Sequence, residues 1–480
     1  MNPAREPVIR IARVVLEAAT PLSVTTGQPD GLFDTGLVTD ANGLPTLPGT
    51  GLAGVLRHLW EAEYGQESAE GLFGYQAGEE GAPSRVSISW GALMDSRGEP
   101  VEGLLLGGER ERLHSDPVLA AAADLAEHPA VRERVCLSER GAASDQGKFD
   151  RAVLPAGHRF AVELTLAGGE EEEWQRLLEL LDHPGLRVGG ATRAGLGRLR
   201  PVACHAGSFD RRDSQQAADF LALGRGLADT GGLEDQRVAR ARGEDDGPWP
   251  TATLHLEPEG PWRIGQGEPD PDASEEKPAD LLPVTEGRIR WDGGVGRVEE
   301  RALLFPASGL KGALAHRFVF HAHCLAGRWA EANREAEALE RAVLFGSIQE
   351  DGEAGRAGCL TLDDAWVEAE PERMRVMHNA IDRFTSGVRE GVLFEEEDLL
   401  GGKVRMPLAL DWRRLERYAS DAGLAVDTIR QALYRTLADL CEGRLALGSR
   451  TTIGNGVFRG RLEGPLADWL AGDETTTEVA

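Results

Sequence analysis

The pattern of hydrophobic and polar residues runs through the same series of elements twice. Residues 8–16 (VIRIARVVL) alternate partly with period two, as do residues 251–256 (TATLHL), and both stretches predict a β-strand. Each strand leads into a turn that contains proline, then a polar loop, and then a hairpin turn at Asn42-Gly43 or at Asp292-Gly293. The repeated order indicates a tandem duplication.

The most similar stretches of the two halves are LPGTGLAGVLRHLW at 47–60 and LFPASGLKGALAHRF at 304–318. Each is interpreted as a strand end, a turn and a helix start, with Thr50 and Ser308 as N-cap residues whose hydroxyls accept helix N–H groups. Glycine residues near the start of a helix destabilise the helix, so we expect that another group approaches the backbone closely at these positions. A helix N-terminus attracts anions, so the group that approaches could be a phosphate of a nucleic-acid backbone. Tight packing of the helix on a sheet is the other explanation, and both stay open.

Further elements follow the helix start in both halves. A Leu-Phe-Gly triplet stands at 72–74 and at 344–346, and each leads into a predicted strand. Next comes a polar, arginine-bearing loop, which begins at Ser138 or at Asn379, followed by a strand and an amphipathic helix. The glycine-rich loops that close the two halves are residues 189–198 and 448–456.

These elements predict a β-α-β-β-α-β order in each half, so the fold class is α+β, with helices on one face of a sheet. We therefore expect two tandem RRM-like or ferredoxin-like domains with loop insertions, one of them partly helical at 101–135. The same architecture binds single-stranded RNA in RRM domains. The expected boundaries are 1–206 for the first domain, 207–247 for a linker, 248–465 for the second domain and 466–480 for an acidic tail.

Composition narrows the class of protein and its compartment. The chain of 480 residues is 41% hydrophobic, which suits folded domains, and has no apolar run long enough to span a membrane. Its N-terminus lacks the apolar segment of a secretory signal. The 5 cysteines are scattered and form no CxxC pair, which fits a reducing compartment and excludes a zinc knuckle. We expect a cytoplasmic protein without a membrane partner.

The formal net charge of -28 counts against non-specific nucleic-acid binding over the whole surface. It still allows a narrow basic groove on an acidic body, because the charges are segregated. Acidic residues gather in stretches predicted as loops or tails, such as 170–173, 270–276 and 395–398. Arginines gather in and beside the glycine-rich loops, and Arg193 and Arg450 lie inside them, where a guanidinium suits phosphate.

The paired elements resemble the RAMP superfamily of CRISPR-associated proteins, and most of all the backbone subunits of type III effector complexes. Four features that occur in both halves carry the resemblance: an Asp before the hairpin, the proline-led helix start, the Leu-Phe-Gly triplet and the closing glycine-rich loop. It covers nearly all of both halves and leaves out the insertion, the linker and the tail. Members with two fused backbone units are known, and this chain is similar to them.

The resemblance implies a subunit that binds guide crRNA and target RNA together with further backbone subunits, a large subunit and a small subunit. In such subunits a β-hairpin thumb wedges between bases of the guide–target duplex, and the loops from Ser138 and Asn379 take that place here. An Asp after the first strand cuts the target RNA with a divalent metal, expected to be Mg²⁺. Asp34 and Asp280 match it as catalytic and metal-binding residues. The implied RNA-binding residues are Thr50, Gly51, Arg57, Arg193, Gly195, Gly197, Ser308, Gly309, Lys311, Arg383, Arg450, Gly454 and Gly456.

Three other interpretations stay open. Asp34 and Asp280 also suit turns, in which case the chain is a structural crRNA-binding backbone subunit without catalysis. A crRNA-processing endoribonuclease of the same superfamily also has two ferredoxin-like halves, although such enzymes are generally shorter. An unrelated ferredoxin-like metabolic enzyme has less support, because the chain carries no cofactor motif.

Overall fold

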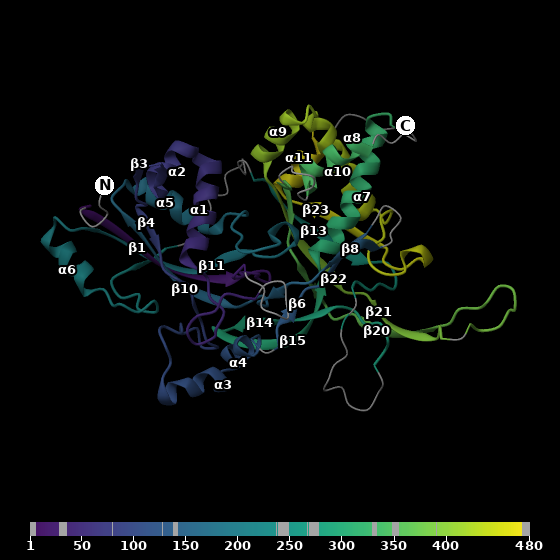
Figure 1. The fold of residues 1–480 in the computed structure, drawn as a ribbon, viewed down its shortest axis with the longest axis horizontal. Coiled ribbons are helices and arrows are strands. Elements are labelled where there is room, and N and C mark those ends of the chain that lie inside the picture. Colours follow the sequence, from purple (N-terminus) through teal and green to yellow (C-terminus); the bar gives the residue numbers. More distant parts are fainter. Residues whose placement is uncertain are drawn as a thin grey trace. The chain divides into compact units, whose positions relative to one another are not determined.

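The structure is a computed structural model of the chain, drawn in Figure 1. It describes residues 6–27, 36–78, 80–126, 128–137, 143–236, 238, 249–265, 267, 278–328, 334–347, 355–389 and 391–472. The chain forms two compact units. Unit 1 comprises residues 1–192, 196–245 and 287–300, and unit 2 comprises residues 193–195, 246–286 and 301–480. Each unit therefore takes a short segment from the other half of the sequence.

The sheet of unit 1 is antiparallel and has the strand order of a ferredoxin-like fold. Its central strand β1 (Val8–Ala18) pairs with β10 (Arg159–Ala167) on one side and with β11 (Leu199–Asp210) on the other. Beyond β10 lie β4 (Val86–Ile88) and β5 (Ala92–Leu93). Taking β4 and β5 as the second strand, the order is fourth, first, third, second, which confirms the predicted fold.

Helices of unit 1 pack their apolar faces on this sheet. They are α1 (Gly49–Tyr64), α2 (Gln66–Phe73) and α5 (Glu171–Glu179). Leucines of α1 and α5 join sheet residues such as Leu16 and Leu164 in one buried cluster. The insertion between β5 and β10 carries two small helices, α3 (Arg112–Ser115) and α4 (Pro117–Asp124), so the prediction that it is partly helical is correct. Its strands are β6 (Ala130–Val131), β7 (Arg134–Leu137), β8 (Ala143–Phe149) and β9 (Ala152–Val153).

Unit 2 repeats the plan. Its central strand β13 (Thr251–Pro258) pairs antiparallel with β22 (Lys403–Leu410) and β23 (Phe458–Glu463). Beyond β22 lie β18 (Leu360–Leu362) and β19 (Ala365–Glu368). The order of the four equivalent positions matches that of unit 1. The helices of this half are α7 (Ala307–Leu325), α8 (Arg334–Phe345), α9 (Trp412–Asp421), α10 (Val426–Cys441) and α11 (Pro465–Ala471).

Two hairpins of the second half extend the plan. The arginine-bearing loop that begins at Asn379 is the tip of a long hairpin, formed by β20 (Glu372–His378) and β21 (Phe394–Leu400), which we call the thumb hairpin (Figure 1). The other hairpin is formed by β14 (Thr285–Asp292) and β15 (Val295–Phe305).

Residues 287–300 of the β14–β15 hairpin belong to unit 1. There the Ile289 N–H donates to the Ala156 carbonyl over 2.9 Å. The Trp291 indole N–H donates to the Gly157 carbonyl over 2.7 Å, and the Arg159 guanidinium lies 3.9 Å from the centre of the Trp291 ring.

Several expectations about element ends are wrong. Both helices start earlier than predicted: Pro48 and Pro306 are the N-cap residues, so Thr50 and Ser308 lie in the first turn and neither caps the helix with its side chain. The segment predicted as a linker begins as ordered structure, since β11 runs on to Asp210, followed by α6 (Ser214–Ala222) and by β12 (Glu234–Asp235), which pairs with β11.

The acidic tail also begins later than expected. Helix α11 occupies the first part of the predicted tail, and Leu466 and Leu470 of this helix are buried in the core of unit 2. None of the described helices combines the length and the apolar character that a membrane span requires.

Candidate nucleic-acid interface

The glycines inside the two helix starts face open space. Gly51 and Gly54 of α1 and Gly309 and Gly312 of α7 are all exposed. A Cβ atom built on any of the four would have no described atom within 4 Å. Tight packing within the chain therefore does not explain these glycines, and the explanation that an outside group approaches them gains support.

Gly49, the first residue of α1, has a different role. A Cβ atom here would come 2.2 Å from the carbonyl oxygen of Ile88, at the end of β4. Only glycine lets α1 begin this close to the sheet. Gly49, two residues before the first open glycine, is therefore needed for packing on the sheet.

The glycine-rich loop of the first half is held by backbone hydrogen bonds to the segment after β1. Gly197 N–H donates to the Pro21 carbonyl over 2.8 Å, and Gly190 N–H donates to the Ser23 carbonyl over 2.8 Å. The φ values of Gly189 and Gly197 are 80° and 86°, which glycine adopts without strain. The loop is therefore fixed at both of its ends.

The glycine-rich loop of the second half is built in the same way. Gly456 N–H donates to the Pro261 carbonyl over 2.9 Å, and Ser449 N–H donates to the Arg263 carbonyl over 2.8 Å. Gly454 and Gly456 have φ values of 101° and 74°. The alignment of the two loops on their glycines is thus reproduced in three dimensions.

This alignment shows that Arg193 and Arg450 are not equivalent. Counting from the first glycine of each loop, Arg450 corresponds to Ala191. Both residues have a left-handed backbone, with φ of 57° at Arg450 and 56° at Ala191, which is uncommon outside glycine. Arg193, two residues later, belongs to unit 2, where its carbonyl accepts a hydrogen bond from Lys311 Nζ over 2.8 Å.

The start of α7 is already occupied by a carboxylate. Asp364, which is 6% exposed, accepts a hydrogen bond from the Ala307 N–H over 2.8 Å. Gly195 lies against the same group, because a Cβ atom on it would come 2.6 Å from Asp364 Oδ1. The N-terminus of this helix thus has an acceptor supplied by unit 2 itself, and Lys311 beside it is engaged by a backbone carbonyl.

Two predicted arginines lie on other elements. Arg57 is partly exposed on α1, one turn after Gly54. Arg383 is in the tip of the thumb hairpin, with its guanidinium 4.7 Å from the centre of the Phe384 ring. Apolar side chains of this tip are largely exposed: Ile381 (65%), Phe384 (81%), Val388 (64%) and Leu393 (63%).

Asp280 lies at the base of the thumb hairpin. Its Oδ2 accepts a hydrogen bond from the Glu395 N–H over 2.9 Å, and the neighbouring Leu281 forms a parallel bridge with Glu396. The carboxylate is exposed to solvent. Asp34 lies outside the described residues. On either side of that segment, the Thr26 N–H donates to the Gly36 carbonyl over 3.1 Å.

The acidic run 395–398, predicted to lie in a loop or tail, is instead part of strand β21, and Glu396 is 1% exposed. Three nitrogen-bearing side chains surround its carboxylate: the guanidinium of Arg263 at 3.2 Å, that of Arg450 at 3.0 Å and the imidazole of His378 at 2.5 Å. A buried acidic residue needs partners from distant segments, which a local sequence pattern does not reveal.

Asp398, two residues along the same strand face, is 2% exposed. Burial raises the pKa of this carboxyl, and the nearby charge of Glu396 raises it further. The Asn455 side chain, from the glycine-rich loop, donates a hydrogen bond to Asp398 over 2.9 Å. The base of the thumb hairpin and the glycine-rich loop are thus joined by polar contacts.

A divalent ion would find few protein ligands here. Among the described residues no group of three or more His, Cys, Asp or Glu side chains is placed to hold a metal ion. A hard ion such as Mg²⁺ is often held by one or two carboxylates with waters and substrate phosphates. The exposed carboxylate of Asp280 fits an ion that is shared with RNA and does not fit a permanent metal centre.

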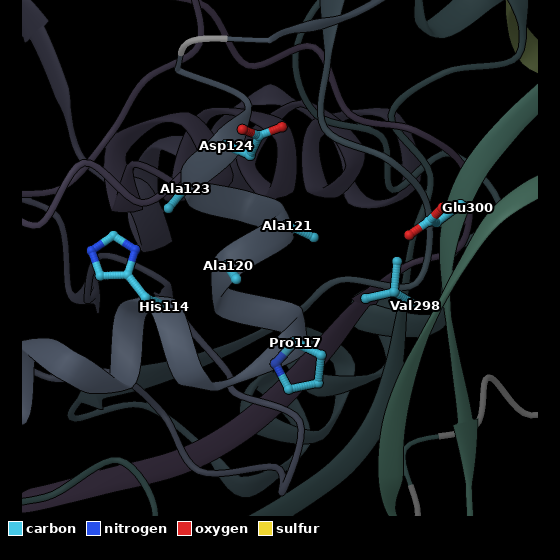
Figure 2. Close-up of a pocket in the computed structure, with 8 residues that line it drawn as sticks. All are labelled: His114, Pro117, Ala120, Ala121, Ala123, Asp124, Val298 and Glu300. Atoms are coloured by element: carbon cyan, nitrogen blue, oxygen red, sulfur yellow. The ribbon is translucent and has the colours of Figure 1, made fainter. Parts of the chain in front are cut away.

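Unit 1 also has a surface cavity of about 610 Å³, away from the duplicated elements. Figure 2 shows that α4 lines one wall and β15 the other. The lining is His114, Pro117, Ala120, Ala121, Ala123, Asp124, Val298 and Glu300. It arises from the insertion, which the second half lacks, so it is separate from the paired helix starts and loops.

Comparison with known protein families identifies the family of the chain. A model of the RAMP superfamily matches residues 15–200 and 255–459. No curated protein matches the sequence. Among solved structures, the chain is similar to a chain from "Cryo-EM structure of the Type III-B Cmr-beta bound to cognate target RNA", with 15% identity and a TM-score of 0.30. That match covers 42% of this chain and 62% of the other, and at this TM-score it says nothing further about this chain.

Proposed function

Because the chain belongs to the RAMP superfamily, we propose that it is a backbone subunit of a type III CRISPR ribonucleoprotein, made of two fused backbone units. It binds guide crRNA, together with further backbone subunits, a large subunit and a small subunit, in the cytoplasm. It also cleaves the target RNA that pairs with the guide. The family match covers both halves, and the four paired features that point to backbone subunits occur in each of them.

The observation that carries RNA binding is the open glycine face of each helix start. Glycine inside a helix costs about 1 kcal/mol relative to alanine. The chain bears this cost at Gly51, Gly54, Gly309 and Gly312 without using the space for its own packing. An RNA strand that lies close against the helix explains all four positions.

Binding through backbone groups also agrees with the charge of the chain. A net charge of -28 gives no broad basic surface. Helix N-termini and glycine-rich turns present N–H groups to phosphate without adding charge to the rest of the protein. We therefore expect weak binding of RNA by the isolated chain and stable binding within the assembled complex.

Cleavage is assigned to Asp34 and Asp280. The Glu395 N–H fixes the Asp280 carboxylate at the base of the thumb hairpin, next to the place where the hairpin meets RNA in this proposal. A bound divalent ion would supply positive charge to the phosphate and lower the pKa of the attacking hydroxyl. The task of the protein is to hold the carboxylate and the target nucleotide in one geometry.

A second candidate is a structural backbone subunit without catalysis. It is favoured by the same hydrogen bond, since a carboxylate that accepts a strand N–H also serves to join a loop to a hairpin. The two candidates share RNA binding and differ only in the chemistry of the aspartates.

Reconstitution with guide RNA and partner subunits tests both. The complex is incubated with end-labelled target RNA, with Mg²⁺ or with EDTA, and the products are separated on a denaturing gel. We expect Mg²⁺-dependent cuts and binding that survives EDTA. A complex that forms without guide RNA overturns the proposal, whereas a complex that binds target and never cuts it supports the structural subunit.

A further inference from the structure

The two helix starts differ at one equivalent position. Leu47, just before α1, forms a β-bridge with Gly91, and the aligned residue before α7 pairs with Ala365. The residue that precedes each of these partners is therefore equivalent in the two halves. It is Trp90 in the first half and Asp364 in the second.

This exchange changes what each helix start offers. Asp364 accepts the first N–H of α7 and places a negative charge where a phosphate would bind. Helix α1 has no side-chain cap, and Trp90 near its first residue is uncharged and 57% exposed. The first start thus has no capping side chain and an exposed aromatic residue at the equivalent position, while the second is closed by its own carboxylate.

The glycine-rich loops differ in the same direction. Leu22 bridges Leu154 in the first half, and Trp262 bridges Leu399 in the second. The residues three positions before these two partners, Arg151 and Glu396, are therefore equivalent.

Their contacts confirm that the positions match. Arg151 Nη1 donates to the Ser23 hydroxyl over 3.4 Å, and Glu396 pairs with Arg263, which is the residue equivalent to Ser23. The same two positions are therefore in contact in both halves, and the residue beside the glycine-rich loop is a cation in the first half and an anion in the second.

Arg151 lies directly on its glycine-rich loop. A Cβ atom on Gly190 would come 2.3 Å from Arg151 Nη1. Among the described residues no carboxylate pairs with Arg151, and its hydrogen bond goes to a neutral hydroxyl. In the second half, Glu396 is nearly fully buried and forms ion pairs with both Arg263 and Arg450. Two separate positions thus make the first half receptive to phosphate and the second half unreceptive.

We propose that the two halves divide the contact with RNA. In the first half, the start of α1 and the glycine-rich loop bind the phosphodiester backbone, with Arg151 on a phosphate and Trp90 stacked on a base. In the second half, Asp364 and Glu396 exclude phosphate from the equivalent places, and the open glycines of α7 serve only for close approach. The inference rests on the proposed RNA binding and names which copy of the site supplies the charge.

The test compares matched variants of the full chain with single-stranded guide RNA at several salt concentrations. Arg151→Gln is expected to weaken binding about tenfold and to lower the slope of log K against log salt by about one. Trp90→Ala is expected to weaken binding about fivefold or more with an unchanged slope, because stacking involves no ion release. Arg450→Gln and Lys311→Gln alter the second-half residues that the family resemblance implied as RNA-binding, and the inference predicts a smaller loss of affinity at each of them than at Arg151.

Removal of the negative charge at the start of α7 is expected to change RNA affinity in the opposite direction. Asp364→Asn keeps an acceptor for the Ala307 N–H and removes the charge, so it is expected to tighten binding by roughly threefold. Thermal unfolding of every variant identifies those that fail to fold, and Arg151→Lys, which keeps the charge, is expected to restore most of the salt slope.

The outcomes separate the two proposals. Wild-type protein that binds no RNA, alone or in the complex, overturns the proposed function and this inference with it. Wild-type protein that binds, with equal losses in both halves or no loss at Arg151, overturns the inference alone. Trp90→Ala that impairs subunit assembly and leaves RNA affinity unchanged shows Trp90 to be a protein contact and overturns the stacking role.

Discussion

Asp280 accepts a hydrogen bond from the Glu395 backbone N–H, with 2.9 Å between the nitrogen and Oδ2. This contact ties the loop after the first strand to the base of the thumb hairpin. It places an exposed carboxylate where the hairpin leaves the body of unit 2. The contact uses only the acceptor property of the side chain, whereas catalysis would use its negative charge.

That difference makes Asp280→Asn a sharp test of catalysis. The amide oxygen still accepts the Glu395 N–H, so the thumb base should stay intact and RNA affinity should be unchanged. Loss of the charge should slow one of two cuts in target RNA by on the order of 10²-fold or more. Asp34→Ala should remove the other cut, because separate sites act independently. Gels of end-labelled target with each variant and with the double variant measure this, and unaltered cuts in the double variant would exclude both aspartates as catalytic residues.

Alanine at the open glycines should separate stability from RNA binding. Gly54→Ala and Gly312→Ala put a methyl group into open space and remove a helix-breaking residue, so each should raise the free energy of unfolding by about 0.5–1 kcal/mol. The same methyl group should weaken RNA binding if a strand lies against the helix. Gly49→Ala is the control, since its Cβ would meet the Ile88 carbonyl and should lower stability. Denaturant melts and filter binding give the two quantities, and unchanged affinity in both open variants would contradict the RNA contact.

The tip of the thumb hairpin should be dispensable for folding and needed for target engagement. Phe384 is 81% exposed, so Phe384→Ser should change the free energy of unfolding by no more than about 0.5 kcal/mol. An exposed aromatic ring beside Arg383 suits stacking against bases, so cleavage of target RNA should fall severalfold. Thr385→Ser, at the next position, is the matched control. Full cleavage by the Phe384 variant would show that this ring has no part in holding the target.

Acid should destabilise unit 1 through His158, which is 1% exposed. Burial lowers the pKa of its imidazole to about 4 from an ordinary value of 6.5. Between these two values the unfolded chain binds a proton that the folded chain does not, so stability falls as the pH decreases from 6.5 to 4. The shift corresponds to about 3 kcal/mol at the lower end.

The check is urea unfolding at pH 4.5, 5.5 and 7.5 for the wild-type chain and for His158→Gln. The glutamine variant does not titrate, so its stability should change less over this range. Equal pH dependence of the two proteins would assign the acid sensitivity to other groups.

The sequence carries the fold because its signals are local and occur twice. Strand β1 and helix α10 follow from their own periodicity, and the glycine-rich loops could be aligned because φ near 80° at Gly189 and Gly448 demands glycine in both. Because each of these patterns occurs in both halves, the order of strands, helices and loops could be assigned, which one copy alone would leave ambiguous.

The rest depends on residues that meet only after folding. Thr50 has the chemistry of an N-cap, yet Pro48 takes that position because Gly49 packs directly on β4. The closure of α7 by Asp364 and the burial of Glu396 each need a partner far away in sequence, so no local pattern could indicate them. The charge difference between the two copies of the site was therefore invisible before the strand register was known.

The exchange of segments between the halves has a consequence for synthesis of the chain. Unit 1 includes residues 287–300, which leave the ribosome only after the segment between the halves and the first strand of the second half. Folding of this unit during translation can therefore be completed only late. Separate expression of the two halves would leave each unit without one of its own segments. A single polypeptide also guarantees that the two kinds of unit are made in equal numbers and in a fixed order.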